Sequence, residues 1–286
     1  MNLLIIGNND GPLRLLKSLK YCQVSIVGVG LQKPVSRQLM IDYKNIHIEG
    51  HFFVEFNNER GLKAKINSLE IDLIVNCFSN IIFKRIINIY PVLNIHLSIL
   101  PAYKGRHPLH WALINGEKEI GFSIHKMTKD IDGGEIYWQH RVSISEGLSV
   151  VCAREKLMLS LEKDFANFLL KYLNYELNIT PNSMQNGFYI SRRYPEDSVI
   201  TEWHDRNLVF RKVMALSSED YPAAIIVNGT KVEVRNAKRP ESVSGEPGKV
   251  SRLLPDGIEV ECGNGNIILK GFSPEDYSLA KNQNIS

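Results

Sequence analysis

Short, uninterrupted runs of apolar residues alternate with stretches of helical spacing along the first half of the chain. Residues 3–6 form such a run, a turn rich in Gly, Asn and Pro ends it, and leucines then recur at helical intervals over 13–19. The same order predicts a strand over 24–29, a helix of which 62–69 is a part, and a strand over 71–75. Buried strands that alternate with helices favour a Rossmann-like α/β fold, in which helices cover both faces of a mainly parallel sheet. Ligands of such sheets bind at the carboxyl ends of the strands.

The pattern changes in the second half of the chain. From Leu157 to Tyr172 apolar and aromatic residues recur at helical spacing, which predicts a long amphipathic helix. A polar stretch over 178–186 follows, and beyond about residue 205 short β-rich runs take over, two of them joined by Asn228-Gly229, a strong hairpin signal. We expect an α/β domain over 1–183, a linker over 184–204 and a small β-barrel-like domain over 205–286.

Composition limits the classes of partner. The chain has 34 Lys plus Arg against 31 Asp plus Glu, with the two signs interspersed, so it carries no polybasic tail of the kind that binds nucleic acid or membranes. Its four cysteines lie far apart without a C-x-x-C pair, which favours buried thiols in a reducing compartment over a zinc site or a disulfide framework. The N-terminus has no basic leader and only about four apolar residues in a row. We therefore expect a cytoplasmic protein without a membrane partner.

The candidate chemistry lies around a predicted strand over 93–97. Asn94 and His96 are two positions apart and project from the same face of that strand, and Pro and Gly residues end it where α/β sheets build their sites. Asp132 comes from a loop between two further predicted strands. An amide, an imidazole and a carboxylate suit acyl transfer to an amine: Asn94 and His96 stabilise an oxyanion, while Asp132 holds His96 and accepts a proton through water. Each residue taken alone is more simply explained as a core, strand-end or turn residue.

Their joint order resembles the signature of the folate-dependent formyltransferases, N-x-H-x-S-x-L-P-x-x-x-G followed further along the chain by D-x-G. The positions that match are Asn94, His96, Ser98, Leu100, Pro101, Gly105, Asp132 and Gly134. Departures are small, such as Lys104 in place of Arg, and the resemblance is weakest over 31–69. It implies that the formyl group of 10-formyltetrahydrofolate is transferred to a primary amine, with Asn94, His96 and Asp132 as the catalytic residues.

The resemblance also implies where the folate cosubstrate binds. In the family the pteridine enters an apolar cleft formed by the loop after the fourth strand, here Phe78, Ile81 and Ile82, which are also explained as core residues. It meets backbone near the catalytic Asp as well, here at Thr128 and Asp130. We expect no metal ion at the site.

Three acceptor amines are open within the family: methionyl-tRNA, glycinamide ribonucleotide and a nucleotide-linked amino sugar. Enzymes for the ribonucleotide look like the first domain alone, so the C-terminal domain argues against it. A tRNA binder neutralises phosphates with Lys and Arg, yet residues 205–286 hold 11 Lys plus Arg against 11 Asp plus Glu. We therefore expect no nucleic acid partner. We favour a dTDP-, UDP- or GDP-linked amino-dideoxy sugar in surface-polysaccharide assembly, with methionyl-tRNA as the alternative acceptor.

The stretch 188–197 looks like the linker of sugar N-formyltransferases. Arg192 and Arg193 are suited to bind a diphosphate, and Tyr189 is suited to stack on a base together with Tyr194. The two arginines are explained equally well as residues that tie the linker to the protein surface.

Asn9 and Asp10 follow the first strand, where they either contact the nucleotide sugar or cap the next helix. Two other readings of the chain stay open, a non-catalytic sensor that binds folate or a nucleotide sugar and a formyl-folate hydrolase. The identity of the sugar, its base and the position of its amino group are also open, as is a homodimer.

Overall fold

A computed structural model describes residues 1–46, 52–183, 185, 187–218, 221–243 and 245–285, and it divides the chain into two units. The first unit takes in Met1–Gly105, Gly121–Val142 and Glu155–Tyr189, and the second takes in Arg106–Ile120, Ser143–Arg154 and Ile190–Ser286. The units are therefore interleaved along the chain, whereas the predicted domains follow one another in chain order. Residues 184 and 186 of the predicted linker, and 219, 220, 244 and 286 of the predicted C-terminal domain, lie outside the described residues.

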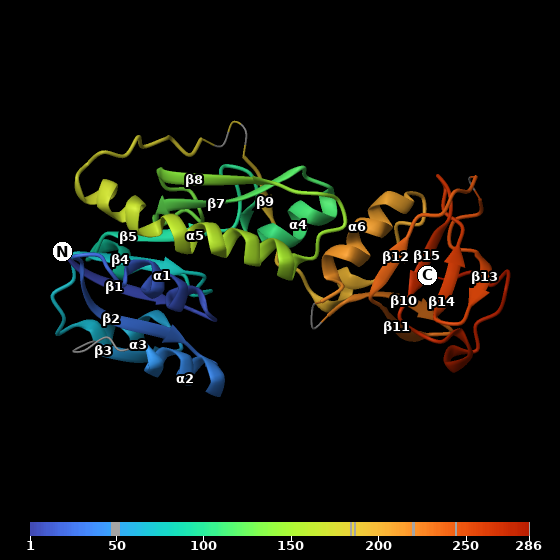
Figure 1. The fold of residues 1–286 in the computed structure, drawn as a ribbon, viewed down its shortest axis with the longest axis horizontal. Helices are drawn as coiled ribbons and strands as arrows, with labels where there is room; N and C mark the ends of the chain where they lie inside the picture. The colour runs from blue at the N-terminus through green and yellow to red at the C-terminus, as the bar shows by residue number, and fades with distance from the viewer. Residues whose placement is uncertain (47–51, 184, 186, 219–220, 244, 286) are drawn as a thin grey trace. The chain divides into compact units, whose positions relative to one another are not determined.

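The first unit is built on a seven-stranded sheet in the order β3-β2-β1-β4-β5-β7-β8 (Figure 1). Its strands are β1 (Asn2–Gly7), β2 (Ser25–Gln32), β3 (Phe52–Phe56), β4 (Leu73–Cys77), β5 (Val92–His96), β7 (Glu119–Lys126) and β8 (Ile136–Ser143). The strands from β3 to β5 run parallel, and β7 pairs antiparallel with β5. The predicted α/β fold with a mainly parallel sheet is confirmed.

Helices pack on this sheet through their apolar positions. They are α1 (Gly11–Leu19), α2 (Arg37–Asn45), α3 (Glu59–Ile66) and the long α5 (Val150–Leu173), with a short 3-10 turn η1 (Ile86–Asn88). The helix expected to include 62–69 is α3, which begins at Glu59 and ends at Ile66, before residue 69. The Asn58 side chain caps its start by accepting a hydrogen bond from the Gly61 N–H. Arg14 of α1 forms ion pairs with Glu155 and Glu162 of α5, at 2.6 and 3.3 Å. Among the described helices, none combines the length and apolar character needed to cross a bilayer.

The second unit combines two helices with small antiparallel sheets. Its helices are α4 (Pro108–Asn115) and α6 (Arg206–Leu216), with 3-10 turns η3 (Pro195–Ser198) and η4 (Pro274–Tyr277). Its strands are β10 (Ala223–Val227), β11 (Thr230–Val234), β12 (Asn236–Lys238), β13 (Val250–Leu254), β14 (Gly257–Val260) and β15 (Ile267–Lys270). The predicted hairpin at Asn228-Gly229 is present, with φ of 49° and 78° at the two turn residues. A second sheet has the order β12-β15-β14-β13, so the small β-rich C-terminal part is confirmed.

Two short strands complete the pairing, β6 (Lys104–Gly105) and β9 (Tyr189–Ile190). The Lys104 N–H donates to the Phe188 carbonyl, and the Phe188 ring packs edge-on against Tyr103 at 4.7 Å between centroids. The returning chain at Phe188 and Tyr189 is therefore fixed beside the segment that follows β5.

The carboxyl ends of β1 and β4 approach each other closely at Gly7, which pairs with Cys77 in the parallel register. A Cβ at Gly7 would lie 2.0 Å from the Cys77 carbonyl oxygen. Only a residue without a side chain fits, so we expect Gly7→Ala to lower the free energy of unfolding by roughly 2–3 kcal/mol. Urea unfolding followed by circular dichroism measures this change.

Gly61→Ala is the matched control, because a Cβ there meets only the Asn58 Oδ1 at an ordinary contact of 3.4 Å. Alanine in a helix is favoured over glycine, so this variant should be as stable as the parent or slightly more stable. Equal stability of the Gly7→Ala variant and the parent would contradict the close approach of the two strands.

Candidate active site

The register of the sheet lines up three polar side chains from neighbouring strands. Asn94 of β5 lies opposite Asn76 of β4 in the parallel pairing and opposite His125 of β7 in the antiparallel pairing. The Asn76 Nδ2 donates to the Asn94 Oδ1 at 2.7 Å, and the Asn94 Nδ2 lies 3.0 Å from the His125 Nε2. The Asn94 amide is therefore held at both of its ends by side chains of the adjacent strands.

His96 is 7% exposed and lies at the end of the same strand. Its Nε2 lies 2.8 Å from the Tyr103 carbonyl oxygen, which only accepts hydrogen bonds, so Nε2 carries the proton. Burial lowers the pKa of His96 below its ordinary value, although the Asp132 carboxylate and the Tyr103 carbonyl act in the opposite direction. The neutral imidazole thus presents the lone pair of Nδ1, which faces the Asp132 Oδ2 at 3.6 Å.

Asp132 completes the group, with a side chain that is 11% exposed. Its Oδ2 accepts the Gly105 N–H at 2.9 Å, and its Oδ1 lies 3.4 Å from both the Asn94 Nδ2 and the His125 Nε2. Burial raises the pKa of this carboxyl, but the neighbouring imidazoles of His125 and His96 and the Gly105 N–H outweigh burial and lower the pKa to about 2. The carboxylate is therefore ionised throughout the physiological range.

The loop that carries Asp132 is held in an uncommon backbone conformation. Asp132 has φ of 46°, in the left-handed region, and the Asn182 Nδ2 donates to the carbonyls of both Asp132 and Gly134, at 2.8 and 2.9 Å. A Cβ at Gly134 would lie 2.0 Å from the Lys126 carbonyl oxygen. The glycine of the D-x-G motif is therefore required by the close passage of β7.

The motif residues between His96 and Gly105 shape a turn. The Ser98 Oγ donates to the Ala102 carbonyl at 2.8 Å, while the Ser123 Oγ accepts the Leu100 N–H at 3.0 Å and donates to the Ser98 carbonyl at 2.7 Å. This turn leads into Tyr103, which has φ of 57° and presents its carbonyl to His96. The spacing of the motif is thus a consequence of the turn that orients the imidazole.

Comparison with known proteins agrees with this geometry. Residues 38–163 match the family model described as Formyl transferase, a range that contains Asn94, His96 and Asp132. This part of the chain belongs to the formyl transferase family. The resemblance seen in the sequence is confirmed.

Solved structures share the fold at low identity. The N-formyltransferase from Helicobacter canadensis, in complex with folinic acid and dTDP-3-aminofucose, has 20% identity and a TM-score of 0.70, over 94% of this chain and 99% of that one. HypX from Aquifex aeolicus with tetrahydrofolic acid has 19% identity and a TM-score of 0.62 over 93% of this chain. This chain spans only 43% of HypX. Methionyl-tRNA formyltransferase from Clostridium thermocellum has 19% identity and a TM-score of 0.58, over 84% of this chain and 94% of that one.

The positions predicted for folate lie on two loops of the first unit. Phe78 has φ of 70° directly after β4, Ile81 is half-buried against the core, and Ile82 is 55% exposed. The Thr128 Oγ1 donates to the Asp130 carbonyl at 3.2 Å, in the turn that leads to Asp132. Among the described residues, no group of His, Cys, Asp and Glu side chains is arranged to hold a metal ion.

Asn9 and Asp10 lie at the carboxyl end of β1. Asn9 is exposed with φ of 51°, and the neighbouring Asn8 N–H donates to the Cys77 carbonyl, so this loop lies beside the end of β4. Asp10 is the N-cap residue directly before α1, but its side chain makes no capping hydrogen bond and pairs with Arg14 at 3.0 Å. The Asp10 side chain therefore does not cap the helix, which was one of the two roles expected from the sequence.

The two predicted arginines have different surroundings. Arg193 is 9% exposed, and its guanidinium donates to the Ser198 Oγ at 2.7 Å and to the Tyr221 carbonyl at 3.4 Å. Arg192 is exposed and lies over the Tyr194 ring, 5.5 Å from its centroid. Tyr189, in the first unit, is 52% exposed and donates from its hydroxyl to the carbonyl of Ile131, next to Asp132.

Two residues of the site were not predicted from the sequence. His125 and Asn76 both bond Asn94. His125 lies in one of the two strands predicted on either side of the Asp132 loop, and Asn76 directly follows the strand predicted over 71–75. Each is a buried polar residue within an apolar run, a pattern that signals a hydrogen-bonding partner inside the sheet. The sequence contains this signal, but the signal does not identify the residue to which each side chain is hydrogen-bonded.

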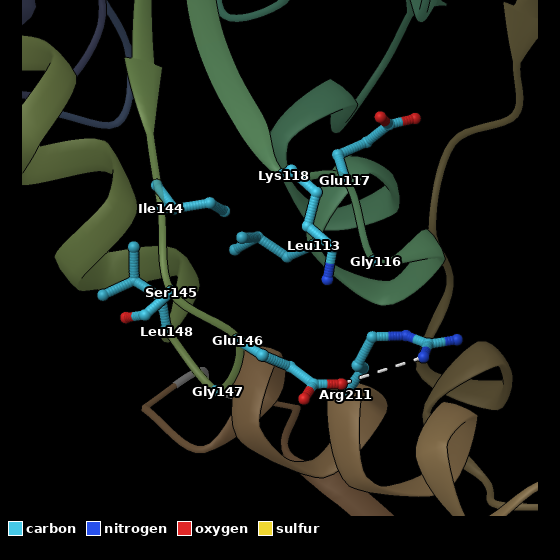
Figure 2. A pocket seen from close by; sticks show the side chains of 10 residues that line it. All are labelled: Leu113, Gly116, Glu117, Lys118, Ile144, Ser145, Glu146, Gly147, Leu148 and Arg211. Carbon is cyan, nitrogen blue, oxygen red and sulfur yellow. Dashed lines mark ion pairs between the residues drawn. The ribbon is translucent and has the colours of Figure 1, made fainter.

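Figure 2 shows a hollow in the second unit, lined by residues around the end of α4 and by the loop that carries Glu146. Two of its charged groups already bind protein atoms: the Arg211 Nε donates to the Ile114 carbonyl at 2.9 Å, and Glu146 forms an ion pair with Arg239 at 2.7 Å. None of the predicted site residues lines it. We assign the hollow no ligand.

The low pKa of Asp132 links this carboxylate to stability in acid. Because its pKa of about 2 in the folded protein lies below that of an ordinary carboxyl, the ionised group stabilises the fold above pH 4. That contribution, roughly 2 kcal/mol, is lost as the pH falls toward 2. We therefore expect the free energy of unfolding of Asp132→Asn to fall less steeply than that of the parent between pH 5 and pH 3. Urea unfolding across this range measures the slope.

Asp276→Asn removes an exposed carboxylate and controls for the change in net charge. This variant should keep the steep slope of the parent. Identical slopes for Asp132→Asn and the parent would show that Asp132 does not hold its charge in the way the geometry implies.

Proposed function

We propose that this protein transfers the formyl group of 10-formyltetrahydrofolate to the amino group of a nucleotide-linked amino-dideoxy sugar. One observation carries the transfer step: the Asn94 amide and the neutral His96 each lie within 3.6 Å of the ionised Asp132 carboxylate. The group thus combines a hydrogen-bond donor, a proton acceptor and a fixed negative charge. No covalent nucleophile is required, because the acceptor amine itself attacks.

His96 is suited to accept the proton of the attacking amine. Attack of the nitrogen on the formyl carbon forms the new C–N bond and leaves an ammonium, which is a strong acid, so a base of lowered pKa suffices. The Nδ1 lone pair receives the proton, and the imidazolium that results is stabilised by Asp132. When the bond between the formyl carbon and the folate nitrogen breaks, the proton passes to that nitrogen.

Asn94 is suited to stabilise the formyl oxygen as it becomes negative. Its Nδ2 contact with Asp132 is long, at 3.4 Å, so one N–H is available to a substrate oxygen. His96 becomes a second donor only after it has taken the amine proton. Asn94 thus donates to the oxyanion from the start, while His96 acts as the base before it becomes a donor. From the sequence, both residues were expected to stabilise the oxyanion.

The formyl donor of the family is 10-formyltetrahydrofolate, and two of the related structures hold folate ligands. In this chain the apolar side chains of Phe78, Ile81 and Ile82 are suited to pack on a pteridine. Phe78 has positive φ, a strained conformation that fixes the direction in which the loop after β4 leaves the strand. Thr128 and Asp130 shape the second loop, whose backbone precedes Asp132.

A cluster of cations in the second unit supports a phosphate-bearing acceptor. Burial and, after it, the neighbouring His110, Arg193, Arg192 and Arg106 together lower the pKa of His107 to about 4. Arg106 and Arg192 are exposed, whereas Arg193 is buried and its guanidinium donates to Ser198. We therefore infer that Arg106 and Arg192 bind the diphosphate and that Arg193 has a structural role.

An amino sugar fits this chain better than tRNA does. The H. canadensis enzyme, whose structure holds dTDP-3-aminofucose, matches over almost its full length. The C-terminal residues 205–286 carry equal numbers of positive and negative side chains, so they present no general field for a polyphosphate. Tyr189, beside the Asp132 loop, offers an exposed ring to the base or the sugar.

The transfer step is tested with His96→Ala and Asp132→Asn. Each should lower turnover roughly 100-fold or more, because each removes a group that acts in the transition state. The assay incubates the protein with 10-formyltetrahydrofolate and a panel of dTDP-, UDP- and GDP-linked 3- and 4-amino sugars, and mass spectrometry detects the formylated product. His204→Ala, an exposed histidine of the second unit, should retain full turnover.

Near-normal turnover in both site variants would refute the assignment of the catalytic residues. If no amino sugar of the panel is formylated and methionyl-tRNA is, the acceptor is tRNA and not a sugar. Binding of tRNA would then weaken steeply as salt is raised.

The adjacent arginines provide a matched pair for the acceptor site. Arg192→Gln should raise KM for the nucleotide sugar roughly tenfold with unchanged thermal stability, since it removes one cation facing solvent. Arg193→Gln should lower the melting temperature, because the Ser198 hydroxyl and the Tyr221 carbonyl lose their donor. Melting curves and steady-state kinetics separate the two effects. If only the Arg193 variant raised KM, Arg193 and not Arg192 would be assigned to bind the diphosphate.

A further inference from the structure

Asn76 is a buried amide in a strand that is otherwise apolar. It is 1% exposed, and the other residues of β4 are Leu, Ile, Val and Cys, all buried. A central parallel strand is usually apolar throughout, and a buried amide is tolerated only where its donors and acceptor are used. The hydrogen bonds of Asn76 therefore indicate what the residue does.

Both ends of the Asn76 side chain are used. Its Nδ2 donates to the Asn94 Oδ1 at 2.7 Å, and its Oδ1 accepts the Ser79 N–H at 3.3 Å. Ser79 is in turn fixed by Gln32 at the end of β2, which accepts from the Ser79 Oγ at 2.9 Å and from the Asn80 N–H at 2.7 Å. A chain of hydrogen bonds thus runs from β2 through the loop after β4 to Asn94.

The Asn94 amide has a donor end and an acceptor end, and only the donor end stabilises a negative oxygen. The short bond from Asn76 occupies the acceptor end, which turns Nδ2 toward His125 and Asp132. When Nδ2 donates to a substrate oxygen, its long contact with Asp132 is the one given up. The bond from Asn76 remains, so it keeps the amide from rotating during the reaction.

We propose that Asn76 is a positioning residue that fixes the orientation of the Asn94 amide for formyl transfer, and that it ties this orientation to the loop after β4. The inference rests on the proposed function for its kinetic consequences. It requires no contact between Asn76 and either substrate.

Asn76→Leu and Asn76→Asp test the proposal together. Asn76→Leu keeps the approximate volume and removes the donor, so kcat should fall roughly 10- to 100-fold while KM for 10-formyltetrahydrofolate stays within about twofold. In Asn76→Asp the ionised carboxylate cannot donate to Asn94, but the protonated acid can. Burial raises the pKa of such a carboxyl, so the kcat of this variant relative to the parent should rise as the pH is lowered from 8 to 6.

Lys212→Met is the control for a loss of stability alone. Lys212 is a buried polar residue of the second unit that bonds the Val199 carbonyl and Glu202. This variant should melt at a lower temperature with its kcat unchanged. If Asn76→Leu does not fold, the pH profile of Asn76→Asp still decides, since a purely structural defect gives a constant ratio to the parent. A constant ratio, or a kcat of Asn76→Leu within twofold of the parent, would overturn the proposal.

A spectroscopic measurement separates this inference from the proposed function. The side-chain amide resonances of Asn94, assigned by their loss in Asn94→Asp, should be distinct and slow to exchange in the parent and should broaden or collapse in Asn76→Leu. This outcome supports the positioning role even if no amine in the panel is formylated. Unchanged Asn94 resonances in Asn76→Leu would refute it, even if the parent enzyme is active.

Discussion

The structure of the site depends on one constraint, which is that an ionised carboxylate sits where water scarcely reaches it. Such a charge is costly unless donors surround it. Asp132 receives the Gly105 N–H on one oxygen and faces Asn94 and His125 with the other. The elements that supply these groups are therefore tied to one another through the carboxylate, as well as through the sheet.

The same constraint explains the unusual backbone around the site. Four of the five described non-glycine residues with positive φ in the first unit lie in loops at or beside the carboxyl ends of the strands, namely Asn9, Phe78, Tyr103 and Asp132, and the fifth, Tyr175, follows α5. Such conformations persist only where the surroundings determine them, and they gather at functional sites. Here they aim backbone groups, such as the Tyr103 carbonyl at His96. The orientation of the imidazole is thereby set before any substrate binds.

The sequence predicts the scaffold well, because apolar runs and helical spacing report burial directly. It also singles out Asn94, His96 and Asp132, because the motif that carries them is long. It does not reveal His125 or Asn76 as partners of Asn94, since that depends on cross-strand register, and a shift by one residue would turn these side chains to the other face. Nor does it distinguish Arg192 from Arg193: adjacent residues in an irregular segment point to different environments, which periodicity does not describe.

The electrostatics of the second unit bear on the acceptor in the same physical terms. His107 has a pKa of about 4, lowered by burial and by the cations around it, so it adds no charge at neutral pH. The permanent positive charge that faces solvent near it comes from Arg106 and Arg192. Two such charges match the two phosphates of a sugar nucleotide, whereas a tRNA acceptor needs many more cations to displace its counterions. The positive and negative charges of residues 205–286 cancel. Affinity for the acceptor therefore has to come from a few contacts at defined positions. Under the proposed function, selectivity for one sugar nucleotide therefore depends on geometry more than on net charge.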